Sequence, residues 1–297
     1  MSSPRRFPLP TRRFPPRWII PPSQSRSKQW WDRRAAVGIL ILGLVIFGTL
    51  FAPWLSPYDP LAVDPPRQFE GPSLGHPFGT DLFGRDVFSR MLYGGRISLA
   101  TGLVAVTIAC IPGLVLGLTA GYFGAKVDGV IMRLMDMMLA FPGILLALTI
   151  VAMLGPGLAN VMLAVGVAAI AGYARLVRGN VLVVRKSLFI RAARSIGASD
   201  GRIIGRHILP NILGSVVVFA TADVAWAILV ASSLSFLGLG VQSPTPEWGA
   251  MISEGRGYLY QAPWITIGPG LALMFTILAI NLLGDSLRDT LDPRLSN

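Results

Sequence analysis

Uncharged stretches dominate the pattern of hydrophobic and polar positions along this chain. No Asp, Glu, Lys or Arg occurs in residues 35–54, 97–125, 137–174 or 224–246. A helix needs about 20 consecutive apolar residues to cross ~30 Å of hydrocarbon, and a soluble core has no need of such long uncharged runs. The pattern therefore predicts an all-α integral membrane protein.

The uncharged run at 137–174 is too long for one crossing. Gly155, Pro156 and Gly157 stand in its middle, and Gly and Pro together are typical of a turn between two helices. We therefore divide this run and expect six transmembrane helices in all. Their predicted ranges are 35–54, 97–123, about 130–154, about 159–176, 211–239 and 264–283.

The second predicted helix carries a stripe of small residues. Gly113, Gly117 and Gly121 are four positions apart and so share one helix face. Small residues let the backbones of two membrane helices approach closely. We expect another transmembrane helix to pack against this stripe.

The basic residues indicate how the chain is oriented. With the N-terminus in the cytoplasm, the segments on that side hold 20 Lys and Arg residues, and the segments on the other side hold five. Cytoplasmic loops of membrane proteins carry such an excess. We therefore predict a multi-pass protein of the cytoplasmic (inner) membrane with both termini in the cytoplasm.

The chain divides into three parts on this reading. Residues 1–34 are basic and contain seven prolines, which is typical of a flexible arm. Residues 35–96 form the first transmembrane helix and an external loop. Residues 97–297 form a core domain with five transmembrane helices and a cytoplasmic loop at 175–210. The external loop either contacts an external protein or holds the helices together, and the residues alone do not separate these two roles.

Composition excludes several kinds of catalytic site. One cysteine, Cys110, and two histidines, His76 and His207, are too few for a disulfide framework or a histidine-built metal site. Gly197, Ser199 and Gly201 match the G-x-S-x-G elbow of hydrolases, but no strand is predicted before them, as that motif requires. No P-loop pattern for ATP is present. We therefore expect no catalytic residue, no metal and no cofactor in this chain.

The loop at 175–210 is the most informative segment, because eight of its residues are basic. Gly197 suits a helix C-terminus, and Ser199 or Asp200 can cap a second short helix, which Pro210 ends. Ala192 and Ala193 have very small side chains, so we expect that a partner's surface approaches them closely. The loop is thus predicted to be a compact two-helix projection outside the bilayer.

These residues also carry a family resemblance. Ala192-Ala193, then Gly197, then Leu209-Pro210 resemble the coupling loop of ATP-binding-cassette (ABC) importer permeases. More narrowly, the chain resembles the second permease subunit of dipeptide, oligopeptide and nickel importers. Further stretches that agree are 76–90 (HPFGTDLFGRDVFSR), 233–240 (SLSFLGLG), 244–249 (PTPEWG) and 281–294 (NLLGDSLRDTLDPR). The chain departs from the family's pattern at Arg191, where a glutamate is frequent, and at Ala231, where an acidic residue often stands.

The resemblance implies a type I ABC importer permease fold and a role in importing dipeptides or oligopeptides. It also implies the partners, which are a homologous second permease, an external substrate-binding protein, and two cytoplasmic ATPase subunits that bind ATP and Mg. The residues that it implies for ATPase coupling are Arg191, Ala192, Ala193, Gly197, Ala198, Ser199, Asp200, Leu209 and Pro210. A permease for nickel, glutathione or another small solute is the nearest alternative, and a secondary transporter is a more distant one.

One acidic residue, Asp223, lies inside a predicted transmembrane helix. A carboxylate in a span is costly and usually faces an aqueous path or a polar partner. Asp223 therefore either belongs to the substrate path or forms a structural pair, for example with Arg133. Arg133 itself stands three residues before Asp136, so these two can also pair on one helix face.

Overall fold

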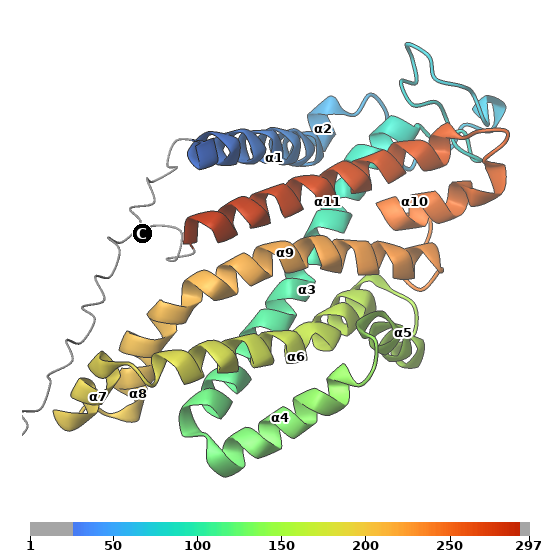
Figure 1. Cartoon of the computed structure of the whole chain (residues 1–297). Coiled ribbons are helices and arrows are strands. Elements are labelled where there is room, and N and C mark those ends of the chain that lie inside the picture. Colours follow the sequence, from blue (N-terminus) through green and yellow to red (C-terminus); the bar gives the residue numbers. More distant parts are fainter. Residues whose placement is uncertain (1–25, 292–297) are drawn as a thin grey trace, which may run out of the picture.

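The structure is a computed structural model that describes the backbone of residues 26–291 and the side chains of residues 33–290. Among the described residues, five helices are long and apolar enough to cross a membrane, and a bent pair of helices makes a sixth crossing if it is counted as one. The long helices are α1 (Arg26–Leu50), α3 (Val87–Phe123), α6 (Leu158–Val184), α9 (Leu209–Phe236) and α11 (Trp264–Leu291). The shorter ones are α2 (Ala52–Leu55), α4 (Ala125–Leu139), α5 (Gly143–Leu154), α7 (Leu188–Ser195), α8 (Asp200–Ile203) and α10 (Trp248–Gly255). Figure 1 shows the long helices as one bundle, with α7 and α8 at one end and α10 at the other.

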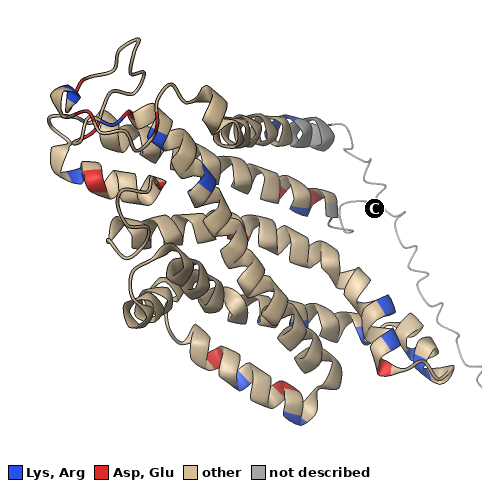
Figure 2. Ribbon diagram, turned by 180° about the vertical axis from the view of Figure 1, so that it is seen from behind, with Lys and Arg blue, Asp and Glu red and all other residues tan. Residues whose placement is uncertain are grey.

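Charged positions gather at the two ends of this bundle and along α4, and the middle of the long helices is nearly free of them (Figure 2). We call the end that carries α7 and α8 the loop end. The opposite end carries α10 and the segment before α3, and we call residues 55–86 together with α10 the cap region. The uncharged middle is the part that lipid can surround.

The third predicted transmembrane helix is wrong in its shape. Instead of one helix over 130–154, the chain forms α4 and α5, which meet at an angle of 86°. The break falls at Phe141-Pro142-Gly143, where Pro142 is the N-cap residue of α5. A proline disfavours helical geometry in the residue before it and has no N–H to continue the ladder, so the helix breaks there. The predicted hairpin at Gly155-Pro156-Gly157 is confirmed, since α5 ends at Leu154 and α6 begins at Leu158.

Two other predicted boundaries are wrong because helices extend further than the apolar runs. The first helix begins at Arg26, within the segment assigned to the arm, and residues 1–25 lie outside the described residues. Helix α6 continues past residue 176 to Val184, so the first ten residues of the predicted loop are helical. Two arginines among these ten residues, Arg175 and Arg178, form ion pairs with Asp136 and Asp128 of α4. These pairs neutralise the charges that had suggested a loop.

Pro210 does not end the second short helix, as the sequence had predicted. A π-helical turn, Ile204–Ile208, follows α8 and leads directly into α9, with Pro210 in the first turn of α9. The Leu209 N–H donates to the Ile204 carbonyl, five residues back. The wider π turn tolerates the missing N–H of proline because the hydrogen-bond register changes just before it.

The glycine stripe on α3 packs against α6, which confirms the sequence prediction. A Cβ atom placed on Gly113 would lie 2.4 Å from Tyr173 Cβ, and one on Gly117 would lie 2.6 Å from the Ala174 carbonyl oxygen. A Cβ on Gly121 would lie 2.7 Å from Val181 Cβ. Only glycine permits so close an approach, and the loop half of α3 is therefore fixed against α6.

The cap region is held together by buried charges. Arg85 donates to Asp81 at 2.6 Å and to Glu254 at 3.0 Å, and Arg90 at the start of α3 also donates to Glu254 at 3.0 Å. Arg85 and Arg90 are 2% and 1% exposed. Beside them, Asp86 accepts from the Ser89 N–H as the N-cap of α3. The network joins the loop before α3 to α10, which lies about 160 residues further along the chain.

Candidate functional site

The loop between α6 and α9 forms the predicted two-helix projection. We call residues 187–208 the α7–α8 segment. Gly197 has φ +80°, its N–H donates to the Arg194 carbonyl at 3.0 Å, and the Ala198 N–H donates to the Ala193 carbonyl at 3.1 Å. These two bonds form a Schellman motif, in which glycine at this position closes a helix. Ser199 then precedes α8 as its N-cap residue. The predicted glycine joint between two short helices is confirmed.

Helix α7 has one face turned into the protein and one face turned outward. Ile190 is fully buried and Ala193 is 7% exposed. The prediction that Ala193 leaves room for a partner is therefore wrong, because Ala193 packs with Ile203 and Ile208 of the same segment. Ala192 is exposed, as predicted.

Three large apolar side chains are exposed on α7 and at its C-cap residue. Leu188 is 78% exposed, Phe189 46% and Ile196 86%. The same segment exposes three arginines that form no ion pair among the described residues, namely Arg191, Arg202 and Arg206. A large apolar surface rimmed by charged side chains is typical of a protein–protein interface. The segment can thus bind another protein, and its charge favours an acidic partner surface.

The inward face attaches the segment to α3 and α6. Ile190, Ile203 and Ile208 share a buried cluster with Tyr122 of α3 and Val181 of α6. The Tyr122 hydroxyl donates a 2.5 Å hydrogen bond to Asp200, the first residue of α8. Of the remaining predicted coupling residues, Ala198 and Leu209 are half-buried and Pro210 is exposed.

Asp223 lies on α9 and is directed into the protein. Its Oδ2 atom and the Tyr173 hydroxyl of α6 are both buried without a hydrogen-bond partner of good geometry, and the two groups interact with each other electrostatically. Neither of the predicted pairs with Arg133 forms, since Asp136 is paired instead with Arg175 at 2.6 Å. Arg133 and Asp136 share a helix face, but α6 supplies a nearer partner. Asp223 thus contacts a neighbouring helix of its own chain.

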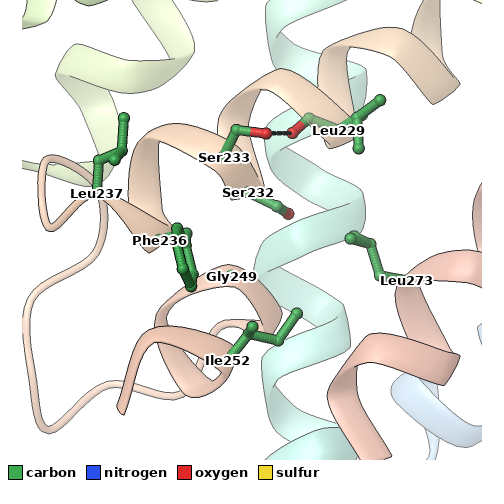
Figure 3. A pocket seen from close by; sticks show the side chains of 8 residues that line it. All are labelled: Leu229, Ser232, Ser233, Phe236, Leu237, Gly249, Ile252 and Leu273. Atoms are coloured by element: carbon green, nitrogen blue, oxygen red, sulfur yellow. Dashed lines mark hydrogen bonds between the residues drawn. The ribbon is translucent and has the colours of Figure 1, made fainter. Parts of the chain in front are cut away.

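An open groove of about 310 Å³ lies beside the end of α9 that is nearer the cap region. Its lining comes from α9, α10 and α11, and Figure 3 shows these side chains around the opening. The lining residues are Leu229, Ser232, Ser233, Phe236, Leu237, Gly249, Ile252 and Leu273. None of them is charged, so the groove offers an apolar wall with a few hydroxyl groups. Four of these eight residues lie in the 233–240 and 244–249 stretches that carried part of the family resemblance.

Comparison with known proteins identifies the family. Residues 113–297 match the model of the "Binding-protein-dependent transport system inner membrane component", and residues 32–72 match the "N-terminal TM domain of oligopeptide transport permease C". The chain belongs to this permease family. It is 47% identical to the dipeptide transport system permease protein of Alkalihalophilus pseudofirmus, over 90% of this chain and 88% of that protein. It is 50% identical to the glutathione transport system permease protein of Escherichia coli, over 93% of this chain and 94% of that protein.

A solved structure supports the fold. The permease matches a chain of an inward-facing MetNI methionine ABC transporter with a TM-score of 0.57 and 20% identity, over 68% of this chain and 96% of that one. The type I importer fold expected from the resemblance is thus confirmed. The permease is a multi-pass inner-membrane subunit of an ABC importer and is not itself an enzyme. A secondary transporter, the more distant alternative, is excluded by this membership.

Sequence reasoning missed two tyrosines that contact the candidate residues. Tyr122 stands next to the predicted end of the second helix at residue 123, and Tyr173 stands in an uncharged run. A tyrosine inside a long apolar stretch is itself a signal, because its hydroxyl requires a partner when buried. The partner, however, is contributed by another helix, and only the fold identifies it.

Proposed function

We propose that this permease carries dipeptides or oligopeptides inward through a path that it forms with a homologous second permease. An external binding protein delivers the substrate, and two ATPase subunits, which bind ATP and Mg, drive the transport. In this proposal the loop end faces the cytoplasm, and the α7–α8 segment is the surface on which one ATPase subunit docks.

The observation that carries the docking proposal is the apolar outward face of α7. Helix α7 lies at the loop end of the bundle (Figure 1), where charged positions gather (Figure 2). Leu188 begins this helix, Ile196 is its C-cap residue, and both are largely exposed. Exposed side chains of this size are costly in water, at about 25 cal/mol for each Å² of apolar surface. A protein surface that covers them recovers this free energy, and the neighbouring arginines add electrostatic attraction.

The orientation is supported by the same 20-to-five excess of Lys and Arg that the sequence shows. Arg185, Arg191, Arg202 and Arg206 all lie at the loop end, and the positive-inside rule favours the cytoplasm for such a segment. The cap region then faces outward, where the binding protein releases its substrate.

The choice of peptides is supported by the relatives, which are named as permeases for dipeptides and for glutathione. Both substrates are short peptides, so a path lined by the same kinds of groups can carry either of them. Glutathione alone, nickel or another small solute are the alternatives. Uptake of a labelled dipeptide by cells that contain the whole importer distinguishes these alternatives. If dipeptides are the substrates, unlabelled mixed dipeptides inhibit this uptake, and glutathione or nickel does not.

The substrate path is proposed to run beside α9. Two features of α9 support this proposal, namely the open groove near its cap end, with the hydroxyl groups of Ser232 and Ser233 in the lining, and the acidic residue Asp223 within its apolar length. A photoreactive dipeptide that labels α9 in the assembled importer supports this placement. Labelling confined to other helices contradicts it.

The docking proposal is tested by Ile196→Asp. Because Ile196 is 86% exposed, the substitution leaves the fold of the permease unchanged, but it replaces the most exposed apolar side chain of the segment with a charge. We expect at least a tenfold loss of ATPase subunits that co-purify with the permease pair. Leu74→Asp is the matched control, since Leu74 is fully exposed in the cap region. Equal ATPase binding by Ile196→Asp and the wild type would refute the docking surface.

A further inference from the structure

The α7–α8 segment is joined to α3 by one specific polar contact. Tyr122, the last residue but one of α3, is 3% exposed, and its hydroxyl donates to Asp200 Oδ1 at 2.5 Å. Asp200 begins α8, directly after the glycine joint. A hydrogen bond to an ionised carboxylate is about twice as strong as one between neutral groups. The contact therefore holds α8 at a defined position on the end of α3.

The ring of Tyr122 contacts the other elements that meet at this point. The Arg194 guanidinium of α7 lies 5.3 Å from the ring centre, and that of Arg185, at the end of α6, lies 5.9 Å from it. Arg185 also donates to the Gly121 carbonyl at 3.3 Å. Stacked guanidinium groups stabilise such an arrangement electrostatically. One side chain of α3 thus contacts both short helices of the segment and lies beside the end of α6.

Helix α3 extends from this contact to the cap region. Its 37 residues span about 55 Å at 1.5 Å per residue. At its far end Arg90 pairs with Glu254 of α10, and the Ser98 hydroxyl donates to Glu247, the N-cap residue of α10. Helix α3 is therefore attached to the α7–α8 segment at one end and to α10 at the other. When Asp200 moves and carries Tyr122 with it, the movement reaches a helix that extends to the cap region.

We propose that Tyr122 is a positioning residue whose hydrogen bond to Asp200 transmits movement of the α7–α8 segment to α3. This inference rests on the proposed function, in which the ATPase subunit binds and moves that segment. When the segment moves, the bond makes α3 follow it, and the path between the permeases changes with α3. Without the bond, only the apolar contacts of Ile190, Ile203 and Ile208 with Tyr122 join the segment to α3. Helix α3 then follows the segment less closely, so more ATP is hydrolysed for each substrate imported.

The test compares Tyr122→Phe with Tyr93→Phe in the complete importer, reconstituted in lipid vesicles with its ATPase subunits and binding protein. Tyr122→Phe removes only the hydroxyl and keeps the ring that packs against the two arginines. Tyr93→Phe makes the same change on the same helix, at the cap end. We expect Tyr122→Phe to keep its ATPase subunits and to hydrolyse about tenfold more ATP per substrate imported. Tyr93→Phe should keep the wild-type ratio.

Two variants of Asp200 complete the test. Asp200→Ala removes the acceptor and should raise the ratio as Tyr122→Phe does, and combining the two substitutions should raise it no further. Asp200→Asn keeps an acceptor oxygen, so its ratio of ATP hydrolysed to substrate imported should stay near that of the wild type. A wild-type ratio in both Tyr122→Phe and Asp200→Ala overturns the proposal. Loss of the ATPase subunits from Tyr122→Phe also overturns it, since the contact would then only shape the docking surface. Failure of the docking proposal is recognised separately, by unchanged ATPase binding in Ile196→Asp.

Discussion

The two ends of α3 lie in very different surroundings. At the cap end, Arg90 is 1% exposed and belongs to a network of two arginines and two acids from the loop before α3 and from α10. At the loop end, Tyr122 makes one hydrogen bond to a short segment, and the outer face of that segment exposes Leu188 and Ile196. At the cap end, α3 thus ends in a network that the chain itself buries. At the loop end, it ends at a segment whose outer apolar side chains no part of the chain covers.

This difference indicates where the chain requires a partner. Charges that are buried and paired within one chain make its fold sensitive to their removal, because an uncompensated buried charge is costly. Apolar side chains that no part of the chain covers are a surface for another protein. Substitutions at the cap end should therefore change the stability of the permease itself. Substitutions on the outer face of the loop end should change its assembly.

The largest effect is expected from Arg90→Met. The substitution removes a fully buried charge and leaves Asp81 and Glu254 with Arg85 alone. Breaking a buried network of this kind costs about 3 kcal/mol, the low end of the usual range because Arg85 remains. We expect a clear fall in the thermal unfolding midpoint of the purified permease. Arg96→Met, which changes an exposed arginine six residues further along α3, should cost less than about 0.5 kcal/mol. Equal midpoints for the two variants would remove the contrast between the ends.

A smaller effect is expected from Gly197→Val. No atom lies within 4 Å of a Cβ placed on Gly197, so the substitution meets no steric neighbour, and its cost comes from the φ of +80° alone. A left-handed conformation costs about 1–2 kcal/mol in a residue with a side chain, and asparagine tolerates it better. Gly197→Val should reorient α7 and weaken ATPase binding about tenfold, with the unfolding midpoint nearly unchanged. Gly197→Asn should lie between Val and the wild type. A lower midpoint with wild-type binding would show that the joint serves stability instead.

The sequence predicted the elements that local chemistry determines. Uncharged length located the long helices, and the glycines at 113, 117 and 121 predicted the close contact of α3 with α6. Gly197 predicted the joint between α7 and α8. These features depend on helix geometry and on residues close together in the chain.

The features that depend on distant residues could not be predicted in this way. Asp136 pairs with Arg175 and not with Arg133, because folding places α6 beside α4. Ala193 is buried because α7 turns that face toward Ile203 and Ile208. An alanine fits both an interior contact and a docking surface, so its small size does not distinguish the two. The 86° bend between α4 and α5 was foreseeable from Pro142, but the length of the apolar run favoured one straight helix.

Cross-linking to an ATPase subunit, combined with thiol labelling from outside the cell, tests most directly whether the α7–α8 segment is the cytoplasmic docking surface. Cys110 is the only cysteine of the chain, so Cys110→Ser provides a background in which Ile196→Cys or Tyr260→Cys adds a single thiol. Ile196 and Tyr260 are both highly exposed; Ile196 is the C-cap residue of α7, and Tyr260 lies in the connection between α10 and α11. We expect the thiol at 196 to cross-link to an ATPase subunit and to be protected from an impermeant reagent added outside the cell. The thiol at 260 should react with that reagent and form no such cross-link. Labelling of position 196 from outside, or an ATPase cross-link at 260 and none at 196, would show that the α7–α8 segment is not the cytoplasmic docking surface.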